Sequence, residues 1–175
     1  TGAATVFDGT YKVDAQFLNS PVTVKVSSIL RGDGAVGDVV VENGGVVRAD
    51  SDGPGRLGGE FVLNSANFQA GGVLGLAFYG PHPTGGNDRL FVNNAVTLTS
   101  ASLSSGFQYA PRDGDVITLI NKNAVGAVSG AFSGFPEGAL RFIGGVPVVM
   151  SYLGGDGNDV TLTVTNLPLH GGGAQ

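Results

Sequence analysis

The chain has 175 residues, no cysteine and a formal net charge of −5. Charged residues make up 13% of it and apolar residues 42%, so it lacks the high charge and low hydropathy of disordered chains. Its 31 glycines are about two and a half times the usual share, but they follow no three-residue period, which excludes collagen. Without cysteine, disulfides, thiolate metal sites and cysteine nucleophiles are excluded too.

The basic residues are scattered singly, whereas nucleic acids and anionic membranes bind clustered basic faces. We therefore expect no nucleic-acid partner. No stretch approaches the roughly 20 apolar residues of a membrane span, so we expect no membrane insertion either. The length favours one domain, which we place at residues 1–165, followed by a polar tail at 166–175.

Short runs of β-forming residues alternate with clusters rich in Gly, Asn and Asp. The runs are Val22–Val26, Val36–Val41, Gly45–Ala49, Glu60–Leu63, Gly72–Phe78, Arg89–Val92, Ala95–Leu98, Val116–Ile120, Ala139–Ile143, Val146–Tyr152 and Val160–Thr165. Only Gly59–Phe68 is compatible with a helix. Because glycine and asparagine tolerate positive φ, each cluster can bend or reverse the chain. This pattern predicts an all-β fold.

The spacing of the clusters favours one architecture within that class. In the first hundred residues they recur about every ten residues, which indicates stacked coils of roughly 20 residues and hence a parallel β-solenoid. A β-sandwich built from hairpins stays open as the alternative, because strands every 8–12 residues fit it as well. In either fold we expect Phe61, Phe68, Phe78, Phe91, Phe107, Phe132, Phe135 and Phe142 to fill the core.

A series of motifs occurs in a recognisable order. It comprises Pro54-Gly55-Arg56-Leu57, Asp88-Arg89-Leu90-Phe91-Val92, Val96–Leu103, Gly114–Ile120, Val128–Ala139 and Ser151–Leu162. From about Gly32 to Val164, this order resembles autotransporter-associated β-strand repeat proteins and PEP-CTERM-type bacterial extracellular proteins. The sorting tail of the latter is missing after Thr165. The resemblance implies the last coils and C-terminal end of a right-handed parallel β-helix, in a secreted or cell-surface protein that is not an enzyme.

The segment Gly154–Leu162 fits the nine-residue repeat of calcium-binding β-rolls. If calcium binds, the donors are Asp156, Asn158 and Asp159, joined by Asp88 only if the fold brings it near. The motif occurs once, however, whereas a β-roll shares each ion between successive turns. We therefore favour a tight turn in which Asn158 and Asp159 bond to their own backbone, and predict no metal site and no cofactor.

No constellation of catalytic residues stands out. The carboxylates available for glycoside hydrolysis are Glu42, Glu60, Glu137 and turn aspartates such as Asp113 and Asp115. A lyase would need a base near acids, but in the pairs Arg31/Asp33, Arg48/Asp50 and Arg112/Asp113 we expect the partners to point to opposite faces. The two histidines, His82 and His170, lie in a loop and in the tail. We therefore predict no catalytic residue.

The expected function follows from the shape. A parallel solenoid leaves an unpaired strand at each end, here Ala4–Phe17 and Asp159–Thr165, and either could pair with another copy. This favours a structural module that self-assembles into filaments or contacts other surface proteins. The alternative is an adhesive or carbohydrate-binding module, in which exposed Tyr11, Tyr79 and Tyr109 and the loop Gly80–Asn87 make the contacts.

Overall fold

The computed structural model describes residues 2–50, 58–80 and 86–166. These residues form strands β1 (Ala4–Val6), β2 (Gly9–Val13), β3 (Gln16–Phe17), β4 (Val22–Val24), β5 (Ser28–Gly32), β6 (Ala35–Val41), β7 (Val46–Ala49), β8 (Glu60–Phe68), β9 (Val73–Phe78), β10 (Arg89–Val92), β11 (Val96–Phe107), β12 (Val116–Lys122), β13 (Ser129–Phe132), β14 (Leu140–Ile143), β15 (Val146–Gly154) and β16 (Asp159–Val164). All sixteen belong to one sheet, which confirms the all-β prediction. The stretch Gly59–Phe68 is strand rather than helix. Within the described ranges there is no helix that could cross a membrane.

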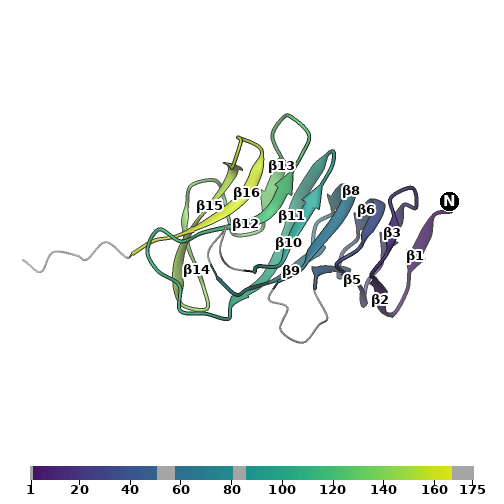
Figure 1. Ribbon diagram of the computed structural model, residues 1–175, viewed down its shortest axis with the longest axis horizontal. Coiled ribbons are helices and arrows are strands. Elements are labelled where there is room, and N and C mark those ends of the chain that lie inside the picture. Colours follow the sequence, from purple (N-terminus) through teal and green to yellow (C-terminus); the bar gives the residue numbers. More distant parts are fainter. Residues whose placement is uncertain (1, 51–57, 81–85, 167–175) are drawn as a thin grey trace, which may run out of the picture.

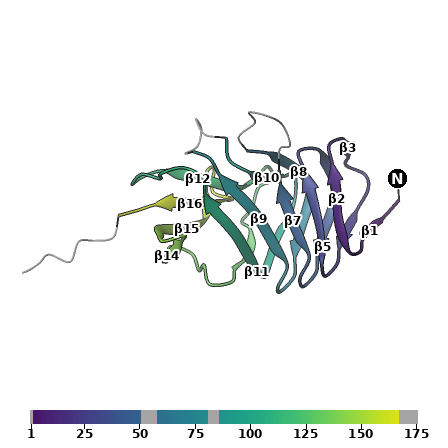
Figure 2. The ribbon, with the colours of Figure 1, turned by 90° about the horizontal axis from the view of Figure 1, so that it is seen from below.

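Most neighbouring strands are parallel and form three ladders (Figures 1 and 2). The first ladder contains β1, β4, β6, β8, β11 and β13, the second β2, β5, β7, β9 and β11, and the third β3, β6, β8, β10 and β12. Strands β6, β8 and β11 are shared because each passes from one ladder to the next. Figure 2 shows β2, β5, β7, β9 and β11 side by side in this order. A β-sandwich built from hairpins, the alternative that the sequence left open, would make neighbouring strands antiparallel. It therefore does not account for these parallel pairs.

The pairing registers align the core in columns. One column contains Val6, Val24, Val41, Phe68 and Leu98, and a second contains Tyr11, Leu30, Val47, Leu74 and Leu103. Phe61, Phe68 and Phe78 are fully buried and Phe132 nearly so, while Phe91, Phe107 and Phe135 are partly buried. Phe142 is 53% exposed, so its assignment to the core was wrong. It lies on β14, which pairs with β15 alone.

A residue with positive φ precedes each stretch of the second ladder, and in β11 it lies within the strand, before the part that pairs with β9. These residues are Asp8, Ser27, Gly44, Gly71 and Ser100, with φ between 46° and 78°. Backbone hydrogen bonds stack the corners, because Ser27 N donates to Gly44 O and Gly44 N to Gly71 O. The two glycines occupy this left-handed region at little steric cost, as their clusters predicted. Asp8, Ser27 and Ser100 occupy it with side chains instead, and of these only Asp8 is followed by a glycine, Gly9.

The C-terminal part departs from parallel pairing. Strands β12, β16, β15 and β14 are antiparallel neighbours in that order. A two-residue turn at Gly144 and Gly145, both with positive φ, joins β14 to β15, as in a type I′ hairpin. The expectation that parallel coils continue to the C-terminal end is therefore wrong. Figure 1 shows this antiparallel unit at the end of the molecule opposite to β1.

Candidate functional site

The N-terminal end of the molecule presents unpaired strand edges. Strands β1, β2 and β3 begin the three ladders, and each has a partner on one side only among the described residues: β4, β5 and β6, respectively. The sequence placed such an edge at Ala4–Phe17, which these strands occupy. It placed a second edge at Asp159–Thr165, and that prediction is wrong, because β16 is paired on both sides, with β12 and β15.

Apolar side chains at this end are incompletely covered. Tyr11 is paired with the fully buried Leu30, and Phe17 with Val36, which is 2% exposed. Yet Tyr11 is 48% and Phe17 49% exposed, because no strand lies on the outer side of β2 or β3 in the described chain. Phe7, in the corner after β1, is 70% exposed. We call Phe7, Tyr11 and Phe17, together with the outer edges of β1–β3, the N-terminal surface.

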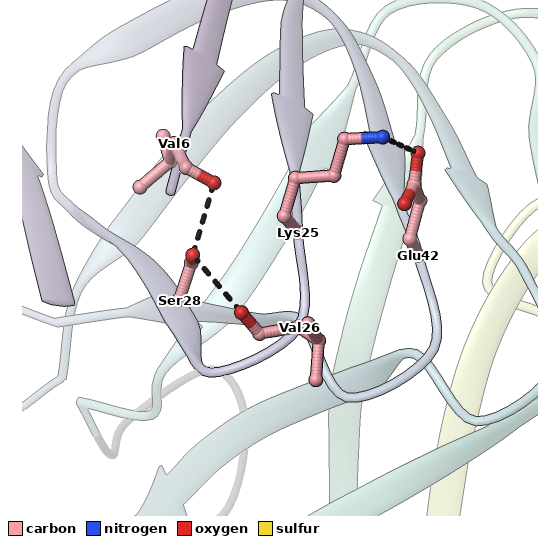
Figure 3. Close-up of polar contacts among 5 residues, drawn as sticks. All are labelled: Val6, Lys25, Val26, Ser28 and Glu42. Atoms are coloured by element: carbon pink, nitrogen blue, oxygen red, sulfur yellow. Dashed lines mark hydrogen bonds and ion pairs between the residues drawn. The ribbon is translucent and has the colours of Figure 1, made fainter. Parts of the chain in front are cut away.

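Polar contacts hold this surface to the strands behind it (Figure 3). The Ser28 hydroxyl is buried and donates to the Val6 carbonyl at 2.9 Å, which ties the end of β1 to the start of β5. Next to it, Lys25 pairs with Glu42 across the following corner. The end of β1 is therefore held against β5, and the corners behind it are held by an ion pair.

A second candidate lies on the outer face of the second ladder. There a groove of about 340 Å³ is lined by Arg48 and Asp50, from β7 and the residue after it, by Tyr79 and Asp88, and by Gln108. Arg48 is paired in register with Gly75, and Gly75 with Ser104, so these three residues form one row across β7, β9 and β11. Ala77 and Gly106 form the next row. We call this the polar groove.

Small residues create the polar groove. A Cβ on Gly75 would lie 2.8 Å from Cγ of Arg48, so the arginine side chain extends over this glycine. Arg48 and Asp50 line the same groove, so the prediction that they point to opposite faces is wrong. They are two residues apart, and alternate residues of a strand share a face. Arg31 likewise reaches Asp50, with 2.9 Å between Nη2 and Oδ2.

Asp88 closes one end of the groove and is buried, with 8% exposure. Its two carboxylate oxygens accept hydrogen bonds from Gly59 N at 2.9 Å and Ala77 N at 2.8 Å. Burial nevertheless raises the pKa of Asp88 above its ordinary value, because desolvation outweighs these bonds. Burial, and then the charges of Asp88 and Asp50, raise the pKa of Tyr79. Tyr79 therefore stays protonated and can donate a hydrogen bond at neutral pH.

The residues of the calcium motif have protein partners. Asp159 accepts a hydrogen bond from Lys122 N at 2.8 Å, and the Asn158 amide donates to Ala124 O at 2.9 Å. These partners lie in and after β12, so both side chains reach beyond the turn that the sequence analysis assigned to them. Asp156 lies exposed in the β15–β16 turn. The described residues contain no cluster of three metal-ligating side chains, and Asp88 and Asp159 bind different backbone groups.

Other predicted residues have structural partners. Glu60 pairs with Arg89, Glu137 accepts hydrogen bonds from Ser151 Oγ and Tyr152 N, and Asp113 accepts one from Asn166 N. Asp115 accepts bonds from the Tyr109 hydroxyl and Arg112 N, so Tyr109 is half-buried rather than exposed as predicted. His82, His170, the Pro54–Leu57 motif, part of the loop at 80–87 and nearly all of the predicted tail lie outside the described residues.

No model of a known protein family matches the chain, and no curated protein is similar enough to count as its relative.

Proposed function

We propose that the protein is a non-enzymatic structural module of a secreted or cell-surface bacterial protein, and that its ladders are the faces of a right-handed parallel β-solenoid. Three features support the solenoid: shared core columns, stacked corners with positive φ, and long strands that pass from one ladder to the next. The order of motifs that resembles autotransporter-associated repeat proteins supports the extracellular setting. In such stacks each repeat buries its apolar face against its neighbours.

We further propose that the module docks another β-sheet edge on its N-terminal surface. The observation that carries this proposal is the half-exposed state of Tyr11 and Phe17 beside three unpaired strand edges. Repeat proteins ordinarily cover the last repeat with a polar face, and charges ordinarily protect exposed strand edges. Here β2 carries the exposed Lys12, paired with Asp14, beside the half-exposed aromatic rings. An added strand would satisfy the free backbone groups and bury the aromatic rings together.

For the purified chain, the partner that fits is a second copy that presents its own N-terminal surface, head to head with the first. The edge expected at the other end, β16, is already paired on both sides, so we propose contact between two N-terminal surfaces in place of filament growth through β16. Contact between two N-terminal surfaces is self-complementary, so it closes at a dimer. In the complete cell-surface assembly, the sheet edge of another surface protein could take the same position.

Sedimentation velocity over a wide range of concentration tests the proposal, with negative-stain microscopy of the same samples. We expect a reversible dimer, and a double substitution Tyr11→Ser and Phe17→Ser should weaken it at least about tenfold. The matched control is Val125→Ser, which removes a 94% exposed apolar side chain far along the chain from the N-terminal surface. A chain that stays monomeric at high concentration, or a dimer that the double substitution leaves intact, would contradict docking at this surface.

A further inference from the structure

The polar groove plays no part in the proposed docking, because it lies on the outer face of β7, β9 and β11 whereas docking uses β1–β3. Its volume of about 340 Å³ falls within the range of small-molecule sites. The rows of paired residues explain its shape: Gly75 and Ala77 form a low floor on β9, Arg48 rises from β7, and Tyr79 stands beyond Ala77 on the same face.

Some polar groups at the groove are already bonded to other groups of the protein, and others can still bond to a ligand. Asp50 is paired with Arg31, and both Asp88 oxygens accept backbone hydrogen bonds. In the part of the chain that the structure describes, no ion pair to Arg48 is seen, and its side chain is exposed. The guanidinium of Arg48, the Gln108 amide and the hydroxyls of Ser104 and Tyr79 therefore remain to contact a ligand.

These groups suit a ligand with many hydroxyls. A guanidinium offers donors only, an amide offers donors and an acceptor, and hydroxyls offer both. An apolar ligand would leave them unsatisfied, at a cost of about 1–3 kcal/mol for each buried group. A strongly anionic ligand would meet the carboxylates of Asp50 and Asp88 in a protein of net charge −5. The Tyr79 ring adds a flat surface with a polar tip, which can contact the C–H face of a sugar ring.

We propose that the polar groove binds a neutral saccharide. Arg48 and Gln108 donate hydrogen bonds to its hydroxyls from opposite sides of the β9 floor, and Tyr79 contacts one ring at the end of the groove. The open floor at Ala77 and Gly106, beside the Arg48 side chain that covers Gly75, admits the sugar ring close to the backbone. Solenoid assembly and saccharide binding then use separate faces of one module, and neither requires the other.

Isothermal titration of the full chain with a panel of oligosaccharides tests this assignment. The panel contains the neutral hexasaccharides cellohexaose, maltohexaose, hexa-N-acetylchitohexaose and xylohexaose, with an oligogalacturonate as the anionic comparison. We expect at least one neutral member to bind. The substitution Gly106→Leu should weaken that binding at least about tenfold, because it fills the floor. A Cβ at Gly106 meets no atom closer than 3.9 Å, so this variant should fold normally.

Two further variants separate the groove from a general effect on folding. Arg48→Met keeps the length of an exposed side chain while removing its donors, and we expect it also to weaken binding. Ser102→Leu places the same leucine on an exposed position of β11 outside the groove, and we expect no change. The assignment is overturned if no neutral member binds, if only the oligogalacturonate binds, or if Gly106→Leu and Ser102→Leu bind equally well.

Discussion

The two ends of one core column differ in how they terminate. The column runs through Phe17, Val36, Leu63, Val92 and Lys122 in the third ladder. Its middle members are buried, but at the N-terminal end Phe17 is 49% exposed. At the other end Lys122 is 4% exposed, and its ammonium donates to the carbonyls of Ala124, Val125 and Gly126. One end thus stops at an apolar ring facing solvent, and the other at a buried charge with protein partners.

The closed end is completed by the antiparallel unit. Met150 and Leu162, from β15 and β16, are fully buried there. The Tyr152 hydroxyl accepts a hydrogen bond from Phe132 N at 2.8 Å and donates one to Phe135 O at 2.7 Å, which fastens β15 to the end of β13. Pairing in register therefore does not by itself cover the last residues of a core column. A terminal unit must also cover the column ends and satisfy their polar groups.

The middle of the column should be the most sensitive position. Leu63→Ala removes a fully buried side chain and leaves a cavity, so we expect the free energy of unfolding to fall by about 2–5 kcal/mol. Urea unfolding followed by circular dichroism measures this loss. A loss as small as that of an end residue would show that the column is not the continuous core described above.

Substitution at the closed end should cause the second largest loss in the free energy of unfolding. Lys122→Met keeps most of the side-chain volume but removes the donor to the carbonyls of Val125 and Gly126, while Ala124 O keeps its bond from the Asn158 amide. We expect a cost of about 1–3 kcal/mol. The control is Lys12→Met, since Lys12 is exposed on β2 and an exposed ion pair contributes about 0–1 kcal/mol. Equal losses in the two variants would contradict the capping role of Lys122.

The open end should matter little to the stability of the monomer. Phe17 is about half covered, so Phe17→Ser should lower the free energy of unfolding by about 1 kcal/mol at dilute concentration. The same substitution should have its larger effect on association. Unfolding measured at low and high protein concentration separates the two. A loss at low concentration that matches Leu63→Ala would mean that Phe17 is a core residue of the isolated chain.

The smallest effect on stability should come from the ionisation of Tyr109 at alkaline pH. Burial, aided by the hydrogen bond to Asp115, raises the pKa of Tyr109 to about 12. Between the ordinary tyrosine pKa of about 10 and this value, the unfolded chain loses the proton before the folded chain does, so stability falls as pH rises. We expect Tyr109→Phe to flatten this alkaline decline, measured by thermal unfolding from neutral pH upward. The decline should persist in Tyr11→Phe, and an identical profile for all three proteins would contradict the assignment.

Much of the fold was predictable because apolar runs and glycine clusters are local signals. Arg89–Val92 is β10 with the predicted bounds, and most other runs overlap a strand. Strands β5 and β13 were missed, since Ser28–Gly32 and Ser129–Phe132 mix glycine and polar residues with few apolar ones. Their strand form depends on pairing with neighbours already in the ladders, which is a tertiary effect.

The sites were harder to predict than the fold. The glycine pair at Gly144 and Gly145 gave a turn signal, but only pairing shows that it closes a hairpin. The polar groove depends on register, since Gly75 becomes its floor only because it aligns with Arg48 and Ser104. One signal was present in the sequence: Arg48 and Asp50 are two residues apart, which alone places them on the same face of a strand.

Amide hydrogen exchange at several protein concentrations tests the docking of the N-terminal surface most directly, because it locates the contact as well as detecting it. If the surface docks a second copy, the amides of β1, β2 and β3 gain protection as concentration rises. Those of β12 and β16, already paired on both sides, stay unchanged. If amide exchange in β1–β3 does not depend on protein concentration, docking at the N-terminal surface is contradicted. This holds whether the chain stays monomeric or dimerises through another surface.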